Sequence, residues 1–206
     1  MASMIGSKVE RKEDKKFLTG KGRYTADITL HNQSYAVFIR SPHARAKIKG
    51  IDAAKAKKAS GVIDVLTGKD LADDKIGGLI AGWKIVSKDG TDMKCPAHPA
   101  LATDTVNYVG DHVALVIAES LQEAKDAADL VNVDYKVLKA VANTGNAMNA
   151  EAIHDGIDKN LCFDWELGDK AKVDEAFSSA DKVVEMNIVN NRLVPNAMEP
   201  RASIGD

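Results

Sequence analysis

The sequence has 206 residues, and its 28 Lys and Arg nearly balance its 30 Asp and Glu, for a net charge of -2. Because nucleic-acid binding needs a basic face that neutralises phosphates, this balance argues against a nucleic-acid partner. No apolar run is near 18 residues long and no charged-then-apolar leader follows Met1, so we expect no membrane span, no cleaved signal and a cytoplasmic location. Cys95 and Cys162 lie far apart without repeated spacing, which supports neither a disulfide framework nor a zinc or iron–sulfur cage.

The amino-terminal third predicts an arm followed by alternating strands and helices. Residues 1–31 are polar and irregular, as in an ordered arm, and Arg23 to Ile28 is the first segment expected to be fixed in place. The elements predicted after the arm are a strand over Ser34 to Arg40, a turn at Pro42, a strand over Ala44 to Ile51, a helix over Ala53 to Ala59 capped by Asp52, a strand over Val62 to Leu66, and a capping box of Thr67 and Asp70 before a short helical turn.

A long segment without periodicity follows, from Asp73 to Ala102. It contains several glycines and the sequence Cys95-Pro-Ala-His98. A loop of this length in a compact domain is usually functional, partner-facing or poorly ordered. Cys95 and His98 could offer two soft metal ligands, but a closed zinc site needs four, so we favour the loop interpretation over a metal site.

The stretch from Thr105 to Val137 has the clearest pattern in the chain. The run Val113 to Ala118 is apolar without alternation, which predicts a central strand buried on both faces. Ser120 and Glu123 form a capping box that predicts a helix to about Leu130. Val131 to Tyr135 then alternates, as in a strand with one wet face.

The carboxyl-terminal third is less regular. The expected elements are weak helix over Val141 to Ile153, a turn over Gly156 to Asn160, a strand over Phe163 to Leu167, a helix opening at Gly168-Asp169, and a long strand over Lys182 to Val189. The mixture of strands and helices without a strict βαβ rhythm predicts an α+β fold, a mixed sheet with helices mainly on one face.

No group of residues meets the requirements for catalysis, so we expect no catalytic, cofactor-binding or metal-binding residue in this chain. Gly20-Lys-Gly22 is too short for a phosphate loop. His43, His112 and His154 are isolated, and a lone His is more often structural than a base, so His112 should touch no metal. Glu199, between Met198 and Pro200-Arg201, can be a buried charge paired at a corner or an acid near a pocket, and we favour the paired charge.

Seven motifs in family order resemble the amino-terminal part of the molybdenum-binding large subunit of the xanthine dehydrogenase, aldehyde oxidase and carbon monoxide dehydrogenase family. The motifs cover essentially the whole chain: Gly22 to Ile28; Arg40 to Ala44 with Ile48 and Ile51-Asp52; Gly61-Val62 with Leu66-Thr67-Gly68 and Asp70-Leu71; Val109-Gly110 with Val113 to Ala118; Ala127-Ala128 with Val131 to Tyr135; Asn160 with Trp165 and Gly168-Asp169; and Asn191-Arg192 with Met198 to Arg201.

The resemblance implies an α/β hammerhead domain that ends at the first strand of a molybdopterin-binding domain. The implied divisions are an arm at 1–20, the hammerhead domain at 21–142, linker and flanking elements at 143–180, and the truncated start of the molybdopterin-binding domain at 181–206. Two departures concern the substrate branch: Arg45 stands where the family often has a second His, and the form of residues 198–201 is more similar to the aldehyde and xanthine side, or to carbon-monoxide-dehydrogenase-like homologues, than to true carbon monoxide dehydrogenases.

The same resemblance implies the chemistry of the whole complex. Such enzymes use molybdopterin to insert a water-derived oxygen into a C–H bond or to oxidise carbon monoxide, with a glutamate base, and pass electrons through two [2Fe–2S] clusters to FAD. The family's pterin-contacting segments and its glutamate lie beyond Asp206, so Glu199 is not that base. Because Met1 lies just before the hammerhead motifs, the resemblance implies separate iron–sulfur and FAD subunits as partners. The alternative is a stand-alone binding or assembly module without redox activity.

Overall fold

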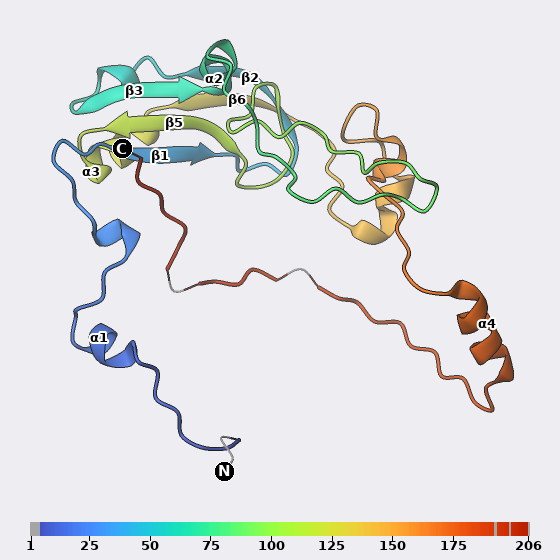
Figure 1. The fold of residues 1–206 in the computed structure, drawn as a ribbon. Coiled ribbons are helices and arrows are strands. Elements are labelled where there is room, and N and C mark those ends of the chain that lie inside the picture. Colours follow the sequence, from blue (N-terminus) through green and yellow to red (C-terminus); the bar gives the residue numbers. More distant parts are fainter. Residues whose placement is uncertain (1–4, 192, 198, 206) are drawn as a thin grey trace. The chain divides into compact units, whose positions relative to one another are not determined.

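The computed structural model describes residues 5–191, 193–197 and 199–205. They divide into two units: residues 34–183 form one, and the segments that precede and follow them form the other (Figure 1). Among the described residues, no helix is long and apolar enough to cross a membrane. Arg192 and Met198, which belong to the last sequence motif, lie outside the described residues.

Residues 34–183 contain two three-stranded sheets. The first has the order β1-β5-β3, with β1 (Tyr35–Arg40), β5 (His112–Ala118) and β3 (Val62–Thr67). The second has the order β4-β2-β6, with β4 (Thr105–Val106), β2 (Ala46–Asp52) and β6 (Asn132–Val137). The α+β class is confirmed, but the mixed sheet is wrong because every strand pair is antiparallel. Consecutive strands β1 and β2 belong to different sheets, which residue patterns within each strand could not reveal.

One helix, α3 (Leu121–Ala128), covers one face of the first sheet. The core beneath it is built from small side chains, with Val65 and Val116 of the sheet against Ala124 and Ala127 of the helix, all at most 1% exposed. Alanines let the helix approach the strands closely, so the short helix still buries apolar surface effectively. A second core on the inner face of the other sheet joins Ala46, Ala102, Val106 and Val113.

The predicted start of α3 is confirmed, with one difference in its cap. The Ser120 hydroxyl oxygen accepts the N–H of Glu123 at 3.2 Å, as the capping box requires. The Glu123 carboxylate accepts the Ser120 hydroxyl at 2.7 Å, whereas a reciprocal box would use the Ser120 backbone N–H. The helix ends at Ala128, two residues before the predicted end.

The prediction that β5 is buried on both faces is only half right. Val116 and Ala118, on the face under α3, are fully buried, whereas Leu115 and Ile117 on the other face are half-buried. The apolar run therefore indicated a central strand correctly, while its second face is only half-buried within the described residues.

The remaining helices are short, and two predicted strands do not form. The helices are η2 (Ala56–Lys58), α2 (Gly68–Asp73), η3 (Thr144–Asn149), η4 (Asp158–Asn160), α4 (Lys170–Ser179) and, in the terminal unit, α1 (Asp14–Leu18) and η1 (Thr25–Asp27). The expected helix over 53–59 is thus a single 3-10 turn, and the expected arm contains the five-residue helix α1. Residues 163–167 and 182–189 are described but carry no strand, because no neighbouring strand supplies a ladder.

Candidate functional site

Several polar groups meet at the corner between β1 and β2. The N–H of Ser41 donates to the carbonyl of Asp111, and the N–H of Gly110 donates to the carbonyl of Ser41, both at 2.8 Å. Arg40 donates to the carbonyl of Gly110 at 3.1 Å, and the carboxylate of Asp111 accepts the N–H of Asn107 at 3.0 Å. Ser41 and Asp111 are almost fully buried, so these bonds satisfy polar groups that water cannot reach.

Ser41 and His43 resemble a nucleophile and base in type but not in geometry. The Ser41 hydroxyl accepts the backbone N–H of His43 and donates to the carbonyl of His43, both at 3.0 Å. The imidazole of His43 instead meets the ring of Tyr135 edge-on, with 5.0 Å between centroids. Burial is the main cause that raises the pKa of Tyr135. A base must reach the hydroxyl it activates, so this pair stabilises a turn.

His112 is a packing residue at the start of β5. Its ring stacks on Phe38 with 4.2 Å between centroids. Burial, followed by the charge of Arg40, lowers the pKa of His112, so its neutral form is favoured. His154 contributes its backbone carbonyl, which accepts the N–H of Ile157 at 3.2 Å.

Cys95 and His98 lie on the long loop and have separate neighbours. The Cys95 thiol is exposed and contacts the carbonyl of Met93 at 3.8 Å, while Nε2 of His98 lies 3.4 Å from the hydroxyl of Tyr108. Within the part of the chain that the structure describes, no three His, Cys, Asp or Glu residues are grouped so that they could hold a metal ion. Cys162 is also a free thiol.

The long loop is anchored at residues that the sequence did not single out. Residues 85–93 turn back on themselves, and the N–H of Lys88 donates to the carbonyl of Asp164 at 2.8 Å. The Lys88 ammonium also pairs with the Asp164 carboxylate at 2.8 Å, which raises the pKa of Lys88. Nothing local could have indicated this contact, because its partners lie far apart in the sequence.

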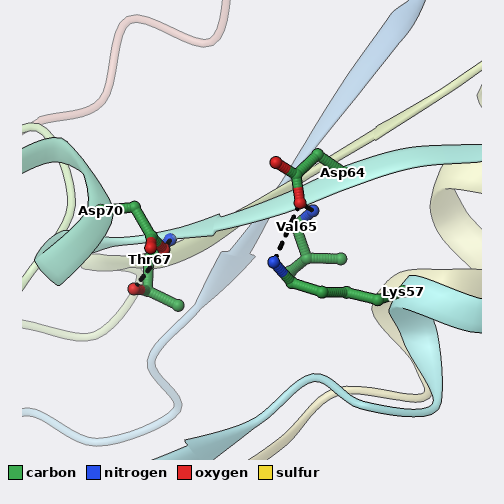
Figure 2. Close-up of polar contacts among 5 residues, drawn as sticks. All are labelled: Lys57, Asp64, Val65, Thr67 and Asp70. Atoms are coloured by element: carbon green, nitrogen blue, oxygen red, sulfur yellow. Dashed lines mark hydrogen bonds and ion pairs between the residues drawn. The ribbon is translucent and has the colours of Figure 1, made fainter. Parts of the chain in front are cut away.

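Two carboxylates along β3 and α2 are held by neighbouring donors (Figure 2). Asp64 accepts the ammonium of Lys57 at 3.0 Å and the N–H of Val65 at 2.7 Å, and the Lys57 bond is the largest cause that lowers the pKa of Asp64. Asp70 accepts the hydroxyl of Thr67 at 2.6 Å and its N–H at 2.7 Å, which lowers the pKa of Asp70. The Thr67 and Asp70 pair confirms the predicted helix start, and both carboxylates stabilise the local backbone.

Arg45, just before β2, ties the segment after β6 to the second sheet, and Asn160 holds that segment together. Arg45 donates to the carbonyls of Lys139 and Ile153, both at 3.3 Å. Asn160, with a left-handed φ of 55°, accepts the N–H of Ile153 at 2.8 Å and donates to the carbonyls of Ala147 and Glu151 at 2.9 and 3.2 Å. Arg45, which marked a departure from the family pattern, therefore has a tethering role.

Glu199 is exposed, so the prediction of a buried paired charge is wrong. Its carboxylate accepts the backbone N–H of Thr25 at 3.4 Å. Over the described residues, Glu199 forms no ion pair with Arg201. The hydrogen-bond partner of Glu199 is thus a backbone group of the same unit.

Two antiparallel sheets, with α3 packed against the first of them, form an α+β domain. Residues 19–139 match the family described as aldehyde oxidase and xanthine dehydrogenase, a/b hammerhead domain. The chain belongs to this family.

Relatives and solved structures agree with this membership. The chain is 35% identical to the nicotine 6-hydroxylase large subunit of Paenarthrobacter nicotinovorans over 99% of its own length and 24% of that protein. It is 34% identical to the carbon monoxide dehydrogenase large chain of Afipia carboxidovorans, over 95% of this chain and 24% of that one. A crystal structure of the Cu,Mo-CO dehydrogenase aligns with a TM-score of 0.66 and 32% identity over 86% of this chain and 23% of that chain. The chain thus spans about a quarter of the length of the relatives it matches.

Proposed function

We propose that this chain is the hammerhead part of the large, molybdopterin-binding subunit of a molybdenum hydroxylase, and that this part is structural, without an active site of its own. The observation that carries the proposal is the match along nearly the whole chain to about a quarter of two large subunits of oxidoreductases. The proposed divisions are the arm at 1–20, the hammerhead domain at 21–142, flanking elements at 143–180, and the start of the molybdopterin-binding domain at 181–206.

The proposal assigns no molybdopterin contact to the described residues. Ser41 and Asp111 are buried polar side chains near family motifs, and both already form hydrogen bonds with neighbouring backbone groups. The proposal therefore routes no step of the reaction through these residues. In this proposal the described polar residues are structural. Ser41 holds the corner, Asp70 holds the start of α2, and Arg45 tethers the segment after β6.

Residues 182–189 support the proposed start of a further domain. They alternate as a strand, yet Val184, Met186 and Ile188 are each at least 75% exposed. Apolar side chains in strand order need a neighbouring strand and a covering layer to be buried. We infer that a partner strand lies in further polypeptide of the same subunit.

The proposal includes separate iron–sulfur and FAD subunits as partners, supported by the names "large subunit" and "large chain" of two relatives. It also includes a cytoplasmic location, which the presence of only two cysteines favours.

The test is to purify the native polypeptide that contains these residues and to measure its mass, its molybdenum content and the proteins that copurify with it. We expect a polypeptide about four times as long as this chain, given the 24% coverage, that contains molybdenum and copurifies with proteins showing iron–sulfur and flavin absorption. A polypeptide of 22.1 kDa without molybdenum would support the stand-alone binding or assembly module instead.

A further inference from the structure

Within the described residues 34–183, no helix covers one face of the first sheet, which we term the open face. Strand register defines it: Phe38 of β1 and Leu66 of β3 both lie opposite Leu115 of β5. In the next row, Ala36 lies opposite Ile117. Side chains directly opposite in neighbouring strands share a face, so these five apolar residues form one contiguous surface.

The two faces of this sheet differ sharply in exposure. Val37, Val65 and Val116 form the corresponding row on the other face, where Val65 and Val116 have no exposed surface under α3. On the open face, Phe38 is 42% exposed, and Leu66 and Leu115 are half-buried. Figure 1 shows β1, β5 and β3 side by side. The open face thus retains water contact that its residue types do not favour.

The second sheet provides a comparison, because its outer face is exposed to solvent and carries charged side chains. On the outer face of β2 and β6, Lys47, Lys49, Asp134 and Lys136 are all exposed. Lys47 lies directly opposite Lys136, a pairing that two charges tolerate only in solvent. The same fold therefore has one sheet with a charged outer face and one with an apolar open face, so the open face is not composed for solvent.

The charges around the open face lie at its ends. Arg40 and His112 lie opposite each other in the row beyond Phe38. Asp64 lies opposite Ile117 at the other end and is paired with Lys57 at 3.0 Å. An apolar centre with charges at its margins is the usual composition of a surface that packs against another protein surface.

We propose that the open face packs against an apolar surface of the remaining polypeptide of the same large subunit, an inference that rests on the proposed function. The relatives have about three-quarters of their length outside the matched part, since the chain covers 24% of each. Polypeptide linked to the same chain has a high effective concentration, so it covers an apolar face in preference to a separate molecule. The partner is thus a further domain of the same subunit, with an apolar centre that contacts Phe38, Leu66 and Leu115.

Hydroxyl-radical footprinting of the native polypeptide tests this inference, with Val116 as an internal reference for full burial. We expect Phe38 and Leu115 to be protected, relative to the urea-unfolded polypeptide, to the same degree as Val116. Acetylation should meanwhile label Lys47 and Lys136 readily. If Phe38 stayed 42% exposed, its protection would be only about twofold, and this result would overturn the inference while leaving the proposed function intact.

Two variants separate the possible occupants. Phe38→Glu should make the native polypeptide at least about tenfold more sensitive to protease, whereas the control Lys47→Glu on the charged face should not. Circular dichroism of Phe38→Glu should retain the strand signal, because the core under α3 is untouched. If Phe38 is protected only in a dimer that dissociates on dilution, the occupant is a second copy and the inference fails. Absence of any longer polypeptide would refute both the inference and the proposed function.

Discussion

Replacing Gly68 by alanine has two opposing effects on stability: a better helix former stabilises, and a steric clash destabilises. Gly68 is the first residue of α2, and alanine favours a helix over glycine by about 1 kcal/mol. However, a Cβ at Gly68 would lie 2.5 Å from the carbonyl oxygen of Ala102 and 2.8 Å from that of Leu101. Leu101 and Ala102 are both buried, and the N–H of Ala102 donates to the backbone carbonyl of His112 at 2.7 Å, so neither residue can move freely. Overpacking of this kind costs about 1–3 kcal/mol, which exceeds the helix gain of about 1 kcal/mol over most of its range, so Gly68→Ala should destabilise the protein by up to about 2 kcal/mol net.

The assay is equilibrium urea unfolding followed by circular dichroism. Gly82→Ala is the matched control, because nothing lies within 4 Å of a Cβ at Gly82, and we expect it to change stability by less than about 1 kcal/mol. If Gly68→Ala proves as stable as Gly82→Ala or the parent, the close approach of α2 to residues 101–102 is wrong.

Three further substitutions test the polar contacts. Ser120→Ala should lower the unfolding free energy in urea by about 1 kcal/mol through loss of the cap to Glu123, and Ser120→Thr should restore most of it. Because bonds from Thr67 lower the pKa of Asp70 below 3.8, its stabilising contribution is present above that value and is lost as pH falls through the lower folded pKa. Asp70→Asn should therefore lower Tm near neutral pH, and this difference from the parent should shrink in acid; a constant difference would contradict the linkage. Asn160→Ala should speed proteolysis at η3 and η4 without loss of strand signal, and unchanged cleavage would show that its three bonds are dispensable.

The elements that could be predicted from the sequence are those fixed by residues close together in the chain. The apolar run of β5 identified the central strand, and Ser120 with Glu123 identified the start of α3. The failures depend on distant partners. Residues 182–189 alternate as a strand but form none, since a strand is defined by its neighbour. The partial exposure of the second face of β5 could not be predicted from its apolar run, because residue types do not show whether another element packs against them.

The polar contacts were less predictable than the elements, for the same physical reason. Thr67 and Asp70 are three residues apart, and their contact followed from helix-capping chemistry. The pair of Lys88 with Asp164 and the bonds of Arg45 to distant carbonyls join segments whose approach depends on the whole fold. His43 was expected to be structural, and the bonds between the Ser41 hydroxyl and the His43 backbone hold a turn there.

The positions of the family motifs explain how a chain whose described residues include no metal-holding group can still be assigned to an enzyme family. Two of the motifs, Arg40 to Ala44 and Val109-Gly110, meet at the corner where Ser41 and Gly110 bond. Gly110 has a φ of 93°, a left-handed conformation that glycine adopts without strain, and its N–H is thereby directed to the Ser41 carbonyl. The residues that identify the family here are those that set the path of the backbone between two sheets. A fold can require particular residues as strictly as a reaction can, so a motif of this kind indicates which scaffold is present.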